Sequence, residues 1–203
     1  MSNLVSAFSA LENIRQKLNQ SSAANKPVIK PQQTDYEAYA SQIARNTVDQ
    51  SLSNFRTKYG FPTKAPALTA DILSYGGKVY SKAEIGNCME VSCAAAYYLE
   101  KLKPVPAWDL VTIGAGDHVF VVLGAGAPAG SLYPADFSTW PADAAVCDVW
   151  ADIACPATDF PARWKARMGN WDNIGRKIGT RGGPVLASTW ADLVGGPKTS
   201  FTH

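Results

Sequence analysis

Two β-rich runs separated by only two residues constrain the fold of this chain more than any other feature. Residues 107–114 (AWDLVTIG) and 117–124 (DHVFVVLG) flank Ala-Gly, a pattern typical of an antiparallel hairpin. A third β-rich run, 144–150 (AAVCDVW), follows a Gly/Ala/Pro-rich segment. Together these runs predict a short antiparallel sheet in the second half of the chain.

Helical patterns dominate the first half, which predicts an α+β fold. Apolar residues recur at helical spacing over 3–19 and 35–55, and a short helix is expected over 70–74 before a loop that leads to Cys88. The polar, Pro-containing segment between the first two helices reads as a linker. We therefore divide the chain into an N-terminal helix and linker (1–33) and a main domain (34–203). Within the main domain, the sequence predicts a helix capped by Asp159 and an irregular final thirty residues.

The composition is that of an ordinary globular protein, with 203 residues of which 46% are apolar and 18% charged. No apolar run reaches the roughly 18 residues that a membrane span requires. The first residues lack a basic segment followed by an apolar block, which predicts no cleaved secretory signal. Four cysteines are too few for a disulfide framework at this length, and we expect them to be reduced.

Charge is distributed unevenly along the chain. Residues 104–162 contain seven aspartates and no Lys or Arg, whereas residues 163–203 contain seven basic residues and two aspartates. Two interpretations are open: these segments attract each other within the fold, or the acidic segment forms a surface that attracts a basic partner protein. The basic residues form no dense stripe with interleaved aromatic residues, which argues against nucleic-acid binding.

The stretch "GNCMEVSCAA" places a cysteine at the expected start of a helix. Asn87 is a favoured N-cap residue and Glu90 stands three positions later, the spacing of a capping box. Free backbone N–H groups at a helix N-terminus favour a thiolate at Cys88 and supply an oxyanion donor. Gly86 allows another chain to approach closely. Cys93 lies about 140° further around the helix, so we expect it to pack in the core.

A cysteine nucleophile needs a base, and the chain contains two histidines. His203 is the last residue, where disorder is the default, so His118 at the start of the second β-rich run is the candidate base. Neighbouring side chains of a strand point to opposite faces, so Asp117 is poorly placed to orient the His118 ring. Asp148, in the third run, is the candidate for holding the imidazole and stabilising its protonated form.

Other chemistry has weaker support in the spacing. Asp143 and Asp152 fall just outside the third run and are second choices for orienting the histidine. No C-x-x-C pair or close Cys/His spacing supports a zinc site. Residues 124–130 (GAGAPAG) have the spacing G-x-G-x-x-x-G, are interrupted by Pro128 and precede no helix, which argues against a dinucleotide loop. We therefore expect neither a metal nor an organic cofactor.

The blocks "GNCMEVSCAA", "DHVFVVLG" and "VCDVWADI", in this order, resemble the papain-like/transglutaminase-like Cys-His-Asp superfamily, and within it secreted bacterial effectors that deamidate or cleave host proteins. The resemblance covers about residues 80–155. It implies a papain-like core with Cys88 as nucleophile, His118 as base and Asp148 as the orienting residue. Two positions depart from the pattern: no proline follows the aspartate, and no glutamine precedes the cysteine. Asn87 or a second backbone N–H would then serve as oxyanion donor.

The resemblance implies a cysteine-dependent hydrolase, foremost a protein glutamine/asparagine deamidase that works through a thioester. A cysteine protease of the same fold, a peptidoglycan amidase and a non-catalytic binding module are the alternatives. The resemblance also implies that the protein is a bacterial effector toxin that is secreted without a cleaved signal peptide. It would then act on a host protein in the cytosol of the host or target cell. Trp140 and Trp150 either pack in the core or line a substrate groove.

Overall fold

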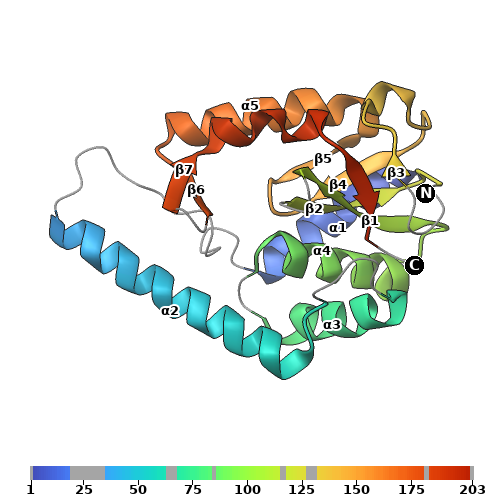
Figure 1. Ribbon diagram of the computed structural model, residues 1–203. Coiled ribbons are helices and arrows are strands. Elements are labelled where there is room, and N and C mark those ends of the chain that lie inside the picture. The colour runs from blue at the N-terminus through green and yellow to red at the C-terminus, as the bar shows by residue number, and fades with distance from the viewer. Residues whose placement is uncertain are drawn as a thin grey trace.

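The chain folds into an α+β arrangement in which helices cover a six-stranded antiparallel sheet (Figure 1). The computed structural model describes residues 2–18, 35–62, 68–83, 86–114, 118–126, 132–180 and 183–201. Its helices are α1 (Asn3–Lys17), α2 (Asp35–Tyr59), α3 (Thr69–Lys82), α4 (Cys88–Tyr97) and α5 (Phe160–Asn173). A single π-helical turn, Tyr98–Leu102, extends α4.

The sheet has the strand order β3-β8-β1-β2-β4-β5. Its strands are β1 (Trp108–Ile113), β2 (His118–Leu123), β3 (Leu132–Tyr133), β4 (Ala145–Asp148), β5 (Ile153–Pro156) and β8 (Lys198–Ser200). The predicted hairpin is present, with Ile113 paired to His118 where the two strands meet their connection. The third predicted strand, β4, lies on the other side of β2, with Cys147 opposite Val121. A separate hairpin joins β6 (Lys177–Thr180) and β7 (Gly183–Leu186).

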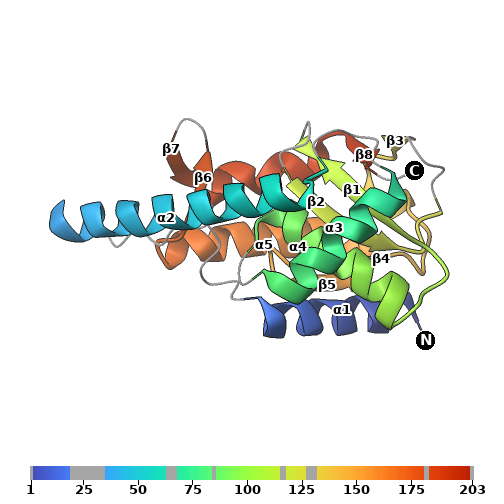
Figure 2. The ribbon, with the colours of Figure 1, turned by 90° about the horizontal axis from the view of Figure 1, so that it is seen from below.

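Helix α1, in the expected N-terminal segment 1–33, packs into the same apolar core as the sheet. The helix lies against the sheet beside α4, as the view from below shows (Figure 2). Its buried face carries Ala7, Ala10, Leu11 and Ile14, which belong to the same apolar cluster as β2 and β4. The predicted linker that follows α1 lies outside the described residues.

Helix α3 is longer than the sequence predicts, because Gly76 and Gly77, which were expected to lie in a loop, lie within the helix. The short helix expected over 70–74 continues to Lys82. A Cβ placed on Gly76 would lie 2.1 Å from the backbone oxygen of Cys93, so the glycine lets α3 approach the α4 backbone. Close packing of α3 on α4 therefore stabilises the helix across a Gly-Gly pair that has low helix propensity.

The final thirty residues contain regular structure, contrary to the irregular segment expected from their glycines. Strand β8 lies between β1 and β3 in the sheet. The side chain of Lys198 is buried and its Nζ donates to the carbonyl oxygens of Ala135, Val194 (2.7 Å) and Gly196 (3.0 Å). The three carbonyl oxygens accept hydrogen bonds from the three N–H groups of the ammonium. The Lys198 side chain therefore connects β8 to the backbone near Ala135 and near residues 194–196.

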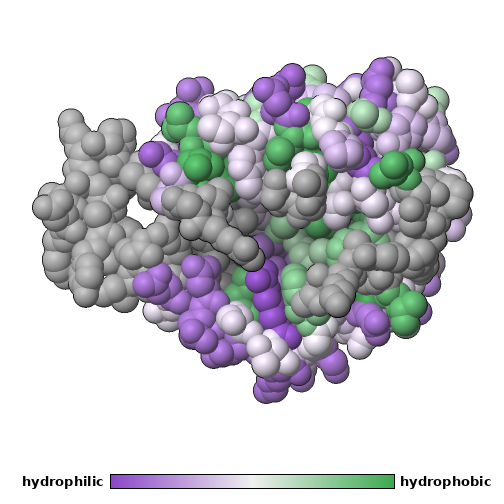
Figure 3. All heavy atoms as spheres, viewed as in Figure 1, coloured by the Kyte–Doolittle hydropathy of each residue, from purple (hydrophilic) through white to green (hydrophobic). Residues whose placement is uncertain are grey.

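Helix α2 extends away from the rest of the chain, and only its C-terminal end lies beside α3 (Figures 1 and 2). Phe55 packs edge-on against Tyr75 of α3, with ring centroids 6.0 Å apart. In the C-terminal half of α2, the exposed positions are mostly hydrophilic (Figure 3). Among the described residues, no helix has the length and apolar content needed to cross a membrane.

Candidate active site

Cys88 is the first residue of α4 and the cysteine that solvent can reach. Its side chain is half-buried, whereas Cys93, Cys147 and Cys155 are buried, and all four thiols are free. Burial raises the pKa of Cys93 and of Cys147, and it raises that of Cys155 to about 12. These three thiols therefore stay protonated at neutral pH and pack as small apolar groups.

The capping box predicted at the start of α4 is present. The backbone N–H of Asn87 donates to Glu90 Oε2 at 3.0 Å, and the Asn87 side chain faces the backbone N–H of Glu90, although its Oδ1 atom is buried without a hydrogen bond of ordinary geometry. A Cβ placed on Gly86 would lie 2.7 Å from Glu90 Cβ. Gly86 thus makes room for the first turn of α4, and the close approach of another chain at this residue stays a prediction.

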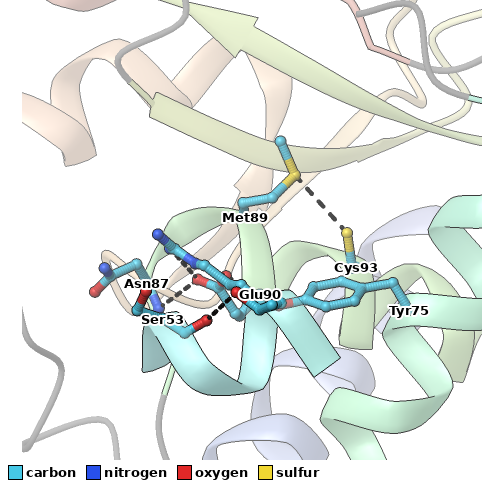
Figure 4. A network of polar contacts seen from close by, with 8 residues as sticks. Ser53, Tyr75, Asn87, Met89, Glu90 and Cys93 are labelled. Atoms are coloured by element: carbon cyan, nitrogen blue, oxygen red, sulfur yellow. Dashed lines mark hydrogen bonds and ion pairs between the residues drawn. The ribbon is translucent and has the colours of Figure 1, made fainter. Parts of the chain in front are cut away.

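Glu90 connects the start of α4 to two other helices (Figure 4). Its side chain is completely buried and accepts two hydrogen bonds from the Arg56 guanidinium of α2, at 2.8 and 3.0 Å. The Tyr75 hydroxyl of α3 donates to Glu90 Oε1 at 3.2 Å. Burial and the Glu90 carboxylate raise the pKa of Tyr75, so the phenol remains a donor. Arg56 and Tyr75 carry no local signal in the sequence that points to Glu90.

His118 and Asp148, expected to act together, form a buried pair. The two side chains are 0% exposed, and His118 Nε2 donates to Asp148 Oδ2 at 2.7 Å. The second carboxylate oxygen, Oδ1, accepts the backbone N–H of Ala151 at 2.9 Å. The pairing follows from the sheet, because β2 and β4 are antiparallel neighbours and Asp148 ends β4 near the start of β2.

The imidazole of His118 is held in its charged form. Burial by itself would lower the His118 pKa, but the charge and hydrogen bond of Asp148 outweigh it and raise that pKa to about 9. The Cys88 thiol contributes to the same rise, which places it beside the ring. Nδ1, the nitrogen that does not meet Asp148, is buried without a hydrogen bond of ordinary geometry. At neutral pH His118 is therefore an imidazolium between a carboxylate and a thiol.

Aromatic side chains enclose the imidazole. The rings of Trp150 and Trp164 lie with centroids 4.9 and 4.8 Å from that of His118. Trp150 is 1% exposed, and Trp140 is 5% exposed and stacks on Tyr133. The two tryptophans considered for a substrate groove are thus placed in the core, where each packs against aromatic neighbours. Sequence spacing gives no sign that Trp164, on α5, would reach His118.

The remaining acidic candidates lie away from the histidine or outside the described residues. Asp143 accepts hydrogen bonds from Asn3 near the start of α1. Asp152 forms ion pairs with Arg15 and Arg167. Asp117 and His203 belong to the part of the chain that is not described.

Much of the acidic segment is engaged within the fold. Asp109 accepts a hydrogen bond from the Tyr133 hydroxyl at 2.7 Å, and Asp148 is bonded to His118. The ion pair of Arg167 with Asp152 joins the basic C-terminal segment to the acidic one. The two segments thus attract each other at this ion pair, and an acidic surface for a basic partner stays a prediction.

The Cys88 thiol, the His118 imidazolium and the Asp148 carboxylate lie next to one another in this order. This arrangement suits acyl transfer through a cysteine. Across the described ranges, no group of three or more His, Cys, Asp or Glu side chains is arranged to hold a metal ion. Comparison of the chain with protein-family models, with curated proteins and with solved structures found no match.

Proposed function

We propose that this chain is a cysteine-dependent hydrolase of the papain-like superfamily that deamidates glutamine or asparagine side chains of a host protein. The observation that carries the proposal is the half-exposed Cys88 at the start of α4, beside a buried His118–Asp148 ion pair. A nucleophilic cysteine needs such a partner, since an adjacent imidazolium stabilises the thiolate. The order of nucleophile, base and carboxylate along the chain also matches the resemblance noted above.

In the proposed reaction, the Cys88 thiolate attacks the carbonyl carbon of a substrate carboxamide. The backbone N–H of Cys88 and a second donor such as the Asn87 side chain stabilise the oxyanion. His118 then gives a proton to the leaving nitrogen, the C–N bond breaks and ammonia departs, which leaves a thioester on Cys88. Water, deprotonated by His118, adds to the thioester and releases a carboxylate, and the thiolate–imidazolium pair is restored.

Alkylation of the free protein tests the state of Cys88 without a substrate. At about pH 6 we expect iodoacetamide to label one thiol per chain, roughly 10- to 100-fold faster than an ordinary cysteine, because the reactive species is the thiolate. The three buried cysteines should remain unlabelled, and Cys88→Ala should remove the label. A rate equal to that of an ordinary thiol contradicts the proposal and favours a binding module.

Mass analysis of candidate host proteins distinguishes the reactions open to this machinery. Wild-type protein should raise the intact mass of its substrate by about 1 Da per modified amide, as replacement of –NH₂ by –OH requires. Cys88→Ala and His118→Ala should leave the substrate unchanged, while Cys93→Ala, at a buried position, is the matched control and should keep activity. New chain termini in place of the mass increase would identify a protease instead. Full activity of His118→Ala would contradict the assignment of the base.

A further inference from the structure

A groove runs between α1 and α5, beside the edge strand β5. It has a volume of about 530 Å³, and its walls include Phe8 and Leu11 of α1, Ile153 of β5, and Arg163 and Arg167 of α5. None of its lining residues belongs to the Cys88 site, so what the groove binds is independent of the proposed hydrolase activity.

The α5 wall of the groove is positively charged. Arg163 and Arg167 stand one helical turn apart and therefore share a face of α5. Arg167 donates to the backbone oxygen of Asp152 at 2.8 Å and contacts Oδ2 of the same residue at 3.3 Å. Arg163 is exposed and forms no ion pair with any other described residue. Its guanidinium is thus available to a ligand.

Two more arginines lie near the groove without lining it. Arg15 of α1 pairs with the other Asp152 oxygen, Oδ1, at 3.1 Å. Arg176 lies over the Trp171 ring, and its Nε is buried without a hydrogen-bond partner. Burial, and after it the nearby positive charges of Arg167 and Arg15, lower the pKa of Arg176.

Asp152 is the carboxylate among the residues that line the groove, and it pairs with both Arg15 and Arg167. An excess of cations around a concave surface attracts an anion. Guanidinium forks match the oxygen geometry of phosphate and hold it by paired, charge-assisted hydrogen bonds. The opposite wall, with Phe8 43% exposed beside Leu11, offers an apolar surface to the group that the phosphate carries.

We propose that the groove between α1 and α5 binds a phosphate monoester, with the phosphate on Arg163 and Arg167 and an apolar substituent against Phe8. The dianion offsets the surplus positive charge, and the apolar substituent covers the exposed ring. The ligand class is an aryl or alkyl phosphate, of which phenyl phosphate is the smallest suitable probe.

Titration calorimetry of the full chain with phenyl phosphate tests this site. We expect saturable 1:1 binding that Arg163→Gln weakens about tenfold, as the loss of one charge-assisted contact predicts. Lys165→Gln is the matched control, because Lys165 lies on the same helix but pairs with Asp192 outside the groove, and binding should be unchanged. Arg163 is exposed, so its replacement should leave the folded state intact, which a thermal melt verifies.

Two further probes separate the parts of the proposed ligand. Phenol, which lacks the charge, should not bind measurably, and inorganic phosphate should bind more weakly than phenyl phosphate. Phe8→Ala should weaken phenyl phosphate but leave inorganic phosphate unchanged. The proposal is overturned if phenyl phosphate shows no saturable binding at concentrations up to about 10 mM, because a Kd above this value corresponds to binding of little specificity. It is equally overturned if Arg163→Gln and Lys165→Gln have the same effect.

Discussion

Replacement of Asp148 by Asn is expected to lower the pKa of His118 from about 9 to below its ordinary value of 6.5. Burial among Trp150 and Trp164 disfavours the imidazolium, and in the wild type the Asp148 carboxylate outweighs that effect, with a smaller contribution from Cys88. An Asn side chain can accept the Nε2 hydrogen bond but supplies no charge. NMR titration of the His118 ring protons measures the change, with His203→Gln used to assign the signals.

The same substitution should change how stability depends on pH. Because folding raises the His118 pKa from 6.5 to about 9, the stabilisation is fully present below pH 6.5 and is lost as the pH rises through 9. The difference in pKa corresponds to about 3 kcal/mol in the free energy of unfolding. Denaturant unfolding between these pH values should show this decline in the wild type and not in Asp148→Asn.

Asp143→Asn is the matched control for both measurements. It removes an aspartate charge from the same region of the chain, but the Asp143 side chain contacts Asn3 rather than the histidine. We expect the His118 pKa and the pH dependence of stability to remain as in the wild type. A His118 that still titrates near pH 9 in Asp148→Asn would show that the carboxylate is not the source of the raised pKa.

Loss of Arg56 is expected to destabilise the fold by about 3–5 kcal/mol, the range for breaking a buried ion pair. The Arg56→Gln substitution leaves Glu90, which is 0% exposed, without its cationic partner. The reverse change, Glu90→Gln, should cost less, because the Arg56 side chain is 34% exposed and its guanidinium can be hydrated. Urea unfolding of the two variants measures the difference.

Two comparisons test that explanation. Lys58→Gln removes a positive charge from an exposed position two residues away on α2, and we expect a change within about 0.5 kcal/mol. The double substitution at Arg56 and Glu90 should lower the free energy of unfolding by less than the sum of the two single substitutions, because no unpaired charge then remains. Strict additivity would mean that the pair contributes no coupling energy. In that case Arg56 would not be what stabilises the buried carboxylate.

Local patterns in the sequence were sufficient to predict the elements that carry the site. The Asn87–Glu90 spacing predicts the start of α4 at Cys88, and the Ala-Gly between two β-rich runs predicts the β1–β2 hairpin. Alternation along β2, combined with the third run, singled out Asp148 as the partner of His118. These features are recognisable because they depend on residues within one turn of helix or on adjacent strands.

Contacts between distant parts of the chain were decided only by the tertiary structure. Arg56 reaches Glu90 from another helix, and Trp164 packs on His118 from α5. The continuation of α3 past Gly76 depends on the backbone of Cys93. Such contacts leave no periodic trace in the sequence, because side chains far apart along the chain meet only when the helices and sheet have packed. The sequence by itself therefore determined which residues begin each element at the site, and packing determined the burial and charge that surround them.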